Sequence, residues 1–371
     1  MLSLVGRLVL LVLLCASSAH SACPSLCECS EAAQTVKCVS KDLREVPLGI
    51  PGYARNLFIL GNHISRIGPE SFKGLENVTN LSLSNNRIME VESHSFSGLR
   101  SLRSLDLSGN QLALIHPEAL AVPGGSLREL NLSRALYNRS AAMDLATALR
   151  WGALTHLQRL DLSANHLVLL PPAMFAHLPA LRRLLLANNS LVAVHNGTFR
   201  GAEQLQELDL TQNGFRTFRE EGLAELERMG NTHLHLGQNP YTCVCGLEDF
   251  AAWLNASRAR VVDAHHLACA FPPELRNVSL LGLGGRDLGC HGDMAGEGAD
   301  LALQTSYVFL GVVLGFVGVV FLFVLYLNRK GIKKWMMEMR DACRDVLEGY
   351  HYRYEIDSDP RLGPVSTSGD L

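Results

Sequence analysis

The sequence lacks the short motifs that mark the common enzyme classes. It contains no G-x-S-x-G, no phosphate-binding loop and no H-E-x-x-H, and the glycine-rich stretch 282–287 fails the dinucleotide-binding pattern. The formal net charge is only −3, which gives no reason to expect a nucleic-acid partner. His233 and His235 share one face of a predicted strand, but two ligands make a weak metal site. We therefore expect no enzymatic activity, no metal and no cofactor.

Cysteine is scarce outside two clusters. Cys15 and Cys343 stand alone, and the other eight cysteines form the sets Cys23, Cys27, Cys29, Cys38 and Cys243, Cys245, Cys269, Cys290. Even clusters behind an export signal indicate disulfides in an oxidising compartment. Three pairings are open within each set, and a zinc site is the alternative for each C-x-C pair.

Two apolar runs stand apart from the rest of the chain. Residues 1–22 combine Arg7, a short apolar run and a small-residue end, as a secretory signal does. Residues 307–327 carry no charge and would form about 31 Å of helix, which predicts one transmembrane helix. Within it, Gly311 and Gly315 have the spacing that lets two spans approach closely, so we predict weak self-association as a homodimer.

Basic residues are absent before this span and dense after it. Residues 291–306 contain no Lys or Arg and are rich in Gly and Ala, which predicts a flexible stalk. The span is followed at once by Arg329, Lys330, Lys333 and Lys334. Because the positive side of a span stays cytoplasmic, we predict a single-pass type I protein of the plasma membrane. Its cytoplasmic tail would be 328–371.

Between the cysteine clusters, residues 54–239 repeat about every 24 residues. The units, such as 81–88 and 105–112, are versions of L-x-x-L-x-L-x-x-N-x-L, the leucine-rich repeat. The repeat asparagines are Asn62, Asn86, Asn110, Asn165, Asn189, Asn213 and Asn239. One degenerate unit has Ala135 at the asparagine position and leads into a predicted short helix within 138–151.

Each repeat predicts a short strand whose leucines need neighbouring repeats to bury them. The asparagine can satisfy backbone groups where the chain leaves the strand. A second apolar column should fill the convex half: Phe72, Phe96, Leu120, Phe175, Phe199 and Leu223. We predict an α/β leucine-rich repeat solenoid with parallel strands on its concave face. Because its ends need covers, cysteine caps are expected at 23–53 and 240–290.

The predicted concave face mixes charged and apolar side chains. We expect its aspartates and arginines to pair with one another in solvent; they include Asp106, Asp161, Asp209, Arg103, Arg128, Arg159, Arg182 and Arg183. Phe58 and Leu185 are large apolar groups on the same face, which suggests contact with a partner. Lys37 and Arg55 lie close to Phe58, and an aromatic beside a cation suits a binding hot spot. Phe271, in the C-terminal cap, is a weaker candidate.

Eight N-x-S/T sequons predict N-glycosylation at Asn77, Asn80, Asn131, Asn138, Asn188, Asn196, Asn255 and Asn277. Two of them, Asn80 and Asn131, fall at strand positions that face the concave side, so glycans there would obstruct part of that face. No sequon occurs between residues 23 and 76. We therefore expect the N-terminal cap and the first repeat to stay bare.

Three stretches resemble the trophoblast glycoprotein family: the cap at 23–33, the span with its flanks at 306–336, and the tail at 348–355. The resemblance implies an N-glycosylated cell-surface protein that inhibits β-catenin-dependent Wnt signalling, through the receptor or coreceptor in the same membrane. The alternative is an adhesion or synapse-organising receptor that binds a protein on an opposing cell. One departure is Gly369, where the family's PDZ-ligand pattern has a hydroxyl residue.

The cysteine spacing also resembles the paired caps of extracellular leucine-rich repeat proteins. This resemblance implies first-to-third and second-to-fourth pairing within each set. The implied disulfides are Cys23–Cys29, Cys27–Cys38, Cys243–Cys269 and Cys245–Cys290.

Overall fold

The computed structural model describes residues 23–257, 260–283, 288, 313–320, 326–331, 333–334, 336–337 and 339–340. It divides into two units, 1–290 and 291–371. Outside the described residues lie the predicted signal at 1–22, the stalk at 291–306 and most of the tail, including Gly369.

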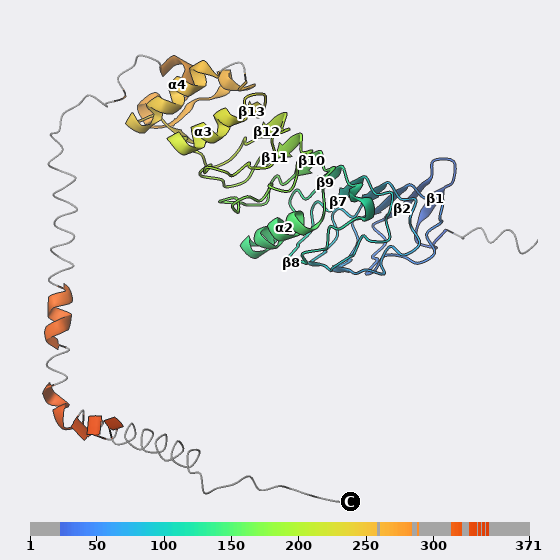
Figure 1. Cartoon of the computed structure of the whole chain (residues 1–371), viewed down its shortest axis with the longest axis horizontal. Coiled ribbons are helices and arrows are strands. Elements are labelled where there is room, and N and C mark those ends of the chain that lie inside the picture. Colours follow the sequence, from blue (N-terminus) through green and yellow to red (C-terminus); the bar gives the residue numbers. More distant parts are fainter. Residues whose placement is uncertain are drawn as a thin grey trace, which may run out of the picture. The chain divides into compact units, whose positions relative to one another are not determined.

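A long sheet runs the length of the repeats and has ten strands within the described part of the first unit (Figure 1). In order they are β1 (Glu28–Ser30), β2 (Thr35–Val39), β3 (Asn56–Leu60), β5 (Asn80–Ser82), β7 (Ser104–Asp106), β9 (Glu129–Asn131), β10 (Arg159–Asp161), β11 (Arg183–Leu185), β12 (Glu207–Asp209) and β13 (His233–His235). The β1–β2 pair is antiparallel and the other neighbours are parallel. The predicted leucine-rich repeat solenoid is confirmed.

The core follows from the alternation of side chains along each strand. In the three-residue repeat strands the central leucine is at most 2% exposed, whereas its two neighbours are half-buried or exposed. The second apolar column is also buried, as predicted: Phe72, Phe96, Leu120, Phe175, Phe199 and Leu223. Its rings stack between repeats, with centroids 5.8 Å apart for Phe72–Phe96 and 6.2 Å for Phe175–Phe199.

The repeat asparagines join one unit to the preceding one. Asn110 donates Nδ2 to the carbonyl oxygens of Leu83 at 3.0 Å and Leu107 at 2.7 Å, and its Oδ1 accepts from Ile88 N at 3.0 Å. In the degenerate unit, the backbone carbonyl of Ala135 replaces the missing side chain and accepts from Leu112 N at 2.7 Å. A backbone oxygen therefore keeps the array continuous where the asparagine is absent.

The side of the array opposite the long sheet carries a shorter sheet and a helix. Strands β4 (Arg66–Ile67), β6 (Glu90–Val91) and β8 (Leu114–Ile115) form this second sheet. Helix α2 (Arg139–Trp151) follows the degenerate unit and lies beside β8 (Figure 1). Its N-cap Asn138 accepts from Ala141 N at 3.0 Å, and it buries residues such as Leu145 and Leu149. The predicted short helix is confirmed.

The N-terminal cap is the β1–β2 hairpin with the loop that follows it. Its disulfides join Cys23 to Cys29 and Cys27 to Cys38. The loop 40–55 returns to the sheet at β3 and carries the buried Ile50. Both cross-links are those that the resemblance implied.

Helix α3 (Glu220–Arg228) precedes β13, and the C-terminal cap follows that strand with more helices than strands among its described elements. It contains β14 (Tyr241–Thr242), η2 (Cys245–Leu247), α4 (Glu248–Ala256), η3 (Ala264–His266), β15 (Cys269–Phe271), η4 (Pro273–Leu275) and η5 (Leu280–Leu283). Cys243 is bonded to Cys269. Cys245 is also disulfide-bonded, and Cys290, its implied partner, lies outside the described residues.

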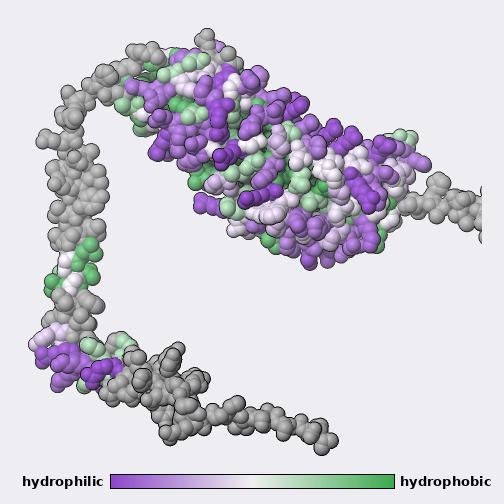
Figure 2. Space-filling view, viewed as in Figure 1, coloured by the Kyte–Doolittle hydropathy of each residue, from purple (hydrophilic) through white to green (hydrophobic). Residues whose placement is uncertain are grey.

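In the second unit, residues 313–320 are helical and hydrophobic (Figure 2). No helix among the residues that the structure describes is long and apolar enough to cross a membrane. The predicted span at 307–327 is described only at 313–320 and 326–327, so Gly311 falls outside. Self-association through Gly311 and Gly315 stays a prediction.

Candidate functional site

The outward face of the long sheet extends over all the repeats. In each strand the residues on either side of the buried leucine point to this face. On β10, for example, Arg159 and Asp161 flank Leu160. The visible surface of the first unit is mainly hydrophilic, with few hydrophobic residues among the polar ones (Figure 2). The outward strand positions are also mostly polar, so a binding site on this face is sought where an apolar side chain departs from that pattern.

The start of the sheet provides one such departure. Lys37 on β2 lies in direct register with Phe58 on β3, so their Cα atoms are neighbours across about 4.8 Å. Phe58 is half-buried and Lys37 is exposed. Arg55, also exposed, precedes β3 and donates its backbone N–H to Gln34 O at 2.8 Å. We call Lys37, Arg55 and Phe58 the N-terminal patch.

The N-terminal patch has a sequon at its border. Asn80 on β5 is in register with Asn56, and its Nδ2 donates to Asn56 Oδ1 at 2.6 Å. A glycan on Asn80 would therefore stand one strand away from Phe58. The patch itself carries no sequon, as the sequence indicates. Its flank toward the cap is free of sequons, whereas its flank toward β5 borders the sequon at Asn80.

The expected pairing between aspartates and arginines on this face is wrong. Asp106, Asp161 and Asp209 use Oδ1 to accept from backbone N–H groups two residues on, at 2.9–3.0 Å. Of the five arginines, Arg183 alone has an ion pair within the described residues, with Glu207 at 3.4 Å. A turn N–H two residues away competes better for each carboxylate than a flexible guanidinium does.

The sequon asparagines are exposed except Asn131, which is half-buried on β9. Asn131 accepts from Ser133 N at 3.0 Å, as the aspartates do at the same position of other repeats, and this bond leaves its Nδ2 available. Asn138 likewise uses only Oδ1, to cap α2. In contrast, Asn77 and Asn255 donate Nδ2 to the backbone, so a glycan there would replace a hydrogen bond. Glycosylation at all eight sequons stays a prediction.

Phe271 lies at the far end of the array from the N-terminal patch. It is 53% exposed on β15, and its carbonyl accepts from Cys243 N at 2.7 Å. The structure therefore does not bring Phe271 together with Lys37, Arg55 and Phe58. The two regions are separate candidates.

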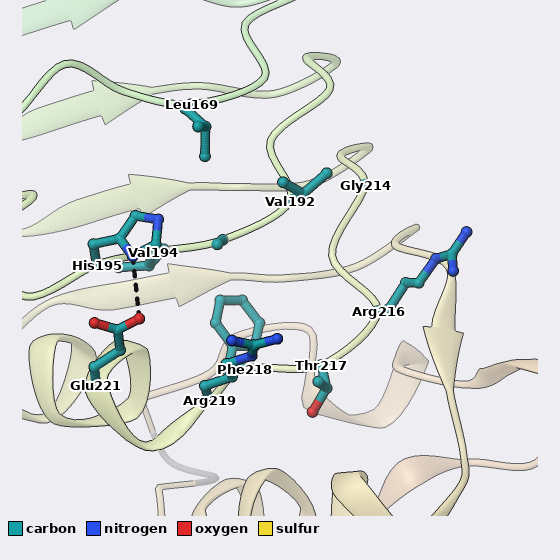
Figure 3. Close-up of a pocket in the computed structure, with 11 residues that line it drawn as sticks. Leu169, Val192, Val194, His195, Gly214, Arg216, Thr217, Phe218, Arg219 and Glu221 are labelled. Atoms are coloured by element: carbon teal, nitrogen blue, oxygen red, sulfur yellow. Dashed lines mark hydrogen bonds and ion pairs between the residues drawn. The ribbon is translucent and has the colours of Figure 1, made fainter. Parts of the chain in front are cut away.

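A hollow of about 520 Å³ lies where three successive repeats turn toward the C-terminal cap (Figure 3). Leu169, Val192 and Phe218 are part of its lining, and His195 Nδ1 contacts Glu221 Oε1 at 3.1 Å. The lining has no cysteine or serine nucleophile and no pair of carboxylates. The sequence did not predict this hollow, because its walls come from separate repeats. The only signal was that Leu169 and Val192, two apolar residues one repeat apart, are about half exposed.

No metal site is formed by the described residues, which contain no suitable group of three or more His, Cys, Asp or Glu side chains. His233 and His235 flank Leu234 on β13, and His235 Nε2 lies 4.0 Å from Glu207 Oε1. This arrangement is a surface pair between a histidine and a carboxylate.

Comparison with known proteins places this geometry in a family. The leucine rich repeat model matches residues 54–112, 147–191 and 179–240. Trophoblast glycoprotein of Homo sapiens is 44% identical over 365 residues, which cover 94% of this chain and 86% of that protein. The chain belongs to the trophoblast glycoprotein family. Trophoblast glycoprotein of Mus musculus is similarly 43% identical over 371 residues, with the same coverage.

A solved structure supports the same assignment. The crystal structure of human 5T4 (Wnt-activated inhibitory factor 1, Trophoblast glycoprotein) matches with a TM-score of 0.65 and 38% identity. The match covers 71% of this chain and 97% of that one. The repeat model has a gap at 113–146, which contains the degenerate unit and the start of α2. The family therefore shares the solenoid, and the irregular unit is where this chain departs from the general repeat.

Proposed function

We propose that this chain is a single-pass glycoprotein of the plasma membrane that inhibits β-catenin-dependent Wnt signalling. The repeats would lie outside the cell, and the chain would act on the Wnt receptor or coreceptor in the same membrane. Membership of the trophoblast glycoprotein family supports this proposal. The name Wnt-activated inhibitory factor 1, which belongs to the similar human protein, supports it further.

The N-terminal patch is the observation that carries the proposal. Phe58 offers an apolar ring on a polar face, and Lys37 and Arg55 add two cations. An aromatic anchor with charged neighbours is the kind of cluster that dominates binding energy at protein interfaces. A receptor surface with an apolar contact and acidic groups would complement it.

A glycan placed on the patch tests this function. Phe58 and Leu60 are the outward positions of β3, whereas Leu57 and Ile59 are buried. Phe58→Asn with Leu60→Thr therefore creates an N-x-T sequon without altering the core. We expect the variant to reach the cell surface with an added glycan and to lose suppression of a β-catenin reporter.

A matched control places a glycan elsewhere on the same face. Asp161→Asn creates a sequon with Ser163, and the new side chain can keep the turn hydrogen bond, as Asn131 does in the native chain. This variant should suppress the reporter as the parent does. Full suppression by the Phe58→Asn/Leu60→Thr variant would contradict the proposal. Suppression that occurs only when cells touch would support the alternative of an adhesion receptor.

A further inference from the structure

A row of side chains runs along the edge of the long sheet where its strands begin. We call it the edge ladder; it consists of Gln34, Arg55, Thr79, Arg103, Arg128, Gln158, Arg182 and Gln206. From Gln34 to Arg182, the carbonyl oxygen of each member accepts the backbone N–H of the next member at 2.7–2.8 Å. These bonds hold the residues at the spacing of parallel strands, about 4.8 Å per unit.

The edge ladder is basic and carries no carboxylate. Its four arginines are exposed, and none has an ion pair among the residues that the structure describes. The aspartates of the same strands do not reach them, because Asp106 accepts from Ser108 N at 3.0 Å and Asp161 from Ser163 N at 2.9 Å. The guanidinium groups of the ladder are therefore available to bind a ligand.

The central part of the edge ladder has the longest run of charge. Arg103 and Arg128 are consecutive members of the ladder, and Arg182 lies two strands beyond Arg128. At the strand spacing the three arginines therefore span about 14 Å. The half-buried Arg159, beside Gln158 on β10, has no ion pair within the described residues either. The exposed Glu129 directly follows Arg128, and it makes no ion pair with its register partner Arg159. No sequon asparagine is a member of the ladder, and the two nearest to its start, Asn77 and Asn80, flank Thr79 rather than the run from Arg103 to Arg182.

We propose that the edge ladder binds a sulfated polysaccharide. Guanidinium groups bind oxyanions through paired, charge-assisted hydrogen bonds, and a row of them fits a linear chain with repeated anionic groups. The neutral members can hydrogen-bond to sugar hydroxyls; they are Gln34, Thr79, Gln158 and Gln206. The ladder contains no apolar side chain, whereas protein hot spots are centred on apolar or aromatic anchors. This favours a polyanionic sugar over an acidic protein.

The proposal rests on the repeats lying outside the cell, where such polysaccharides occur, but not on Wnt inhibition. The probe is heparin, immobilised and presented to the full chain purified in detergent. We expect the parent to bind, and the triple variant Arg103→Gln/Arg128→Gln/Arg182→Gln to bind about tenfold or more weakly. Added salt should weaken binding of the parent, because exposed charges are screened.

The control removes the same charge elsewhere. Arg87, Arg150 and Arg200 are exposed and lie off the ladder, so Arg87→Gln/Arg150→Gln/Arg200→Gln should bind heparin nearly as the parent does. Equal weakening of both triple variants would overturn the proposal, as would binding of the parent to desulfated heparin as tight as to heparin. Binding to polyglutamate as tight as to heparin would assign the ladder to an acidic protein instead. No Wnt reporter enters this test, so its failure is distinguishable from failure of the proposed function.

Discussion

The N-terminal cap adds strands to the long sheet, whereas the C-terminal cap covers the other end with helices. β2 pairs with β3 over five residues, and this places Lys37 of the cap beside Phe58 of the first repeat. At the other end, β14 and β15 pair with each other and lie outside the long sheet. The first cap therefore extends the long sheet by two strands, whereas the second adds to β13 only one parallel bridge, between Leu234 and Val261.

The two caps also differ in what holds them together. Few side chains of the N-terminal cap are buried, among them Val36, Cys38 and Ile50. The C-terminal cap has a cluster of rings around Phe250, whose centroid lies 5.0 Å from that of Phe218 and 5.3 Å from that of Tyr241. A thin cap depends on its cross-links, but a cap with its own core has a second source of stability.

Truncation of the central ring of the C-terminal cap should have the largest effect. Phe250 is fully buried, so Phe250→Ala should lower the free energy of unfolding by about 3–5 kcal/mol, because the ring contacts are lost and a cavity remains. Thermal unfolding of the purified chain measures this loss. Phe271→Ala, at an exposed position of the same cap, should stay within about 0.5 kcal/mol of the parent. Similar losses for both variants would mean that the cap has no such core.

Removal of a disulfide should affect the two caps differently. Cys27→Ser/Cys38→Ser should cost about 2–4 kcal/mol and open the N-terminal cap to trypsin at Lys37 and Lys41. The corresponding Cys243→Ser/Cys269→Ser variant should cost a similar amount, but the ring cluster should keep the C-terminal cap resistant at Arg260 and Arg276. Limited proteolysis followed by mass spectrometry identifies the first cleavage. Earlier cleavage in the C-terminal cap would reverse the comparison.

The repeats between the caps contain no cysteine, and loss of a repeat asparagine should have the next largest effect on stability. Asn110→Ala removes the bonds to Leu83, Leu107 and Ile88 and should cost about 2–3 kcal/mol, because buried backbone groups lose their partner. Denaturant titration measures the change. Asn231→Ala serves as control, because Asn231 is exposed and its side chain makes no hydrogen bond within the described part of the chain. No difference between the two would show that backbone groups replace Asn110 as they replace the missing asparagine at Ala135.

The smallest predicted effect concerns the ring of Tyr241 in the C-terminal cap. Burial raises the pKa of its phenol well above the ordinary value of 10.0, and the Asp263 carboxylate adds to the rise. Just above pH 10 the phenol of Tyr241 loses its proton in the unfolded chain but keeps it in the folded chain. The stability that depends on the protonated phenol is therefore fully present below that pH, and it is lost as the pH rises through the raised pKa of the folded state.

Tyr241→Phe tests this linkage. It removes a 2.7 Å bond from the phenol to Leu236 O and should cost about 1 kcal/mol at neutral pH. Because the variant has no phenol at this position, its stability should fall less than that of the parent above pH 10. Unfolding curves at pH 8 to 11, as approximate bounds around the ordinary Tyr pKa, measure both effects. Parallel losses in parent and variant would contradict the raised pKa.

The sequence by itself determined the repeat architecture, because burial of leucine and phenylalanine at a fixed period leaves few ways for neighbouring units to stack. The aromatic column, the role of the asparagines and the helix after Ala135 follow from local patterns of this kind. The cysteine pairs of the N-terminal cap came from resemblance, since spacing alone left three choices for that set.

Only the tertiary structure decided which polar groups meet. Asp106 and Asp161 bind turn N–H groups rather than the arginines of the same face. Arg103, Arg128 and Arg182 therefore align without carboxylates along the sheet edge, and the hollow beside Phe218 forms from three separate repeats. Such contacts depend on the register between units and on competition among close partners, and a pattern within one repeat carries no information about either.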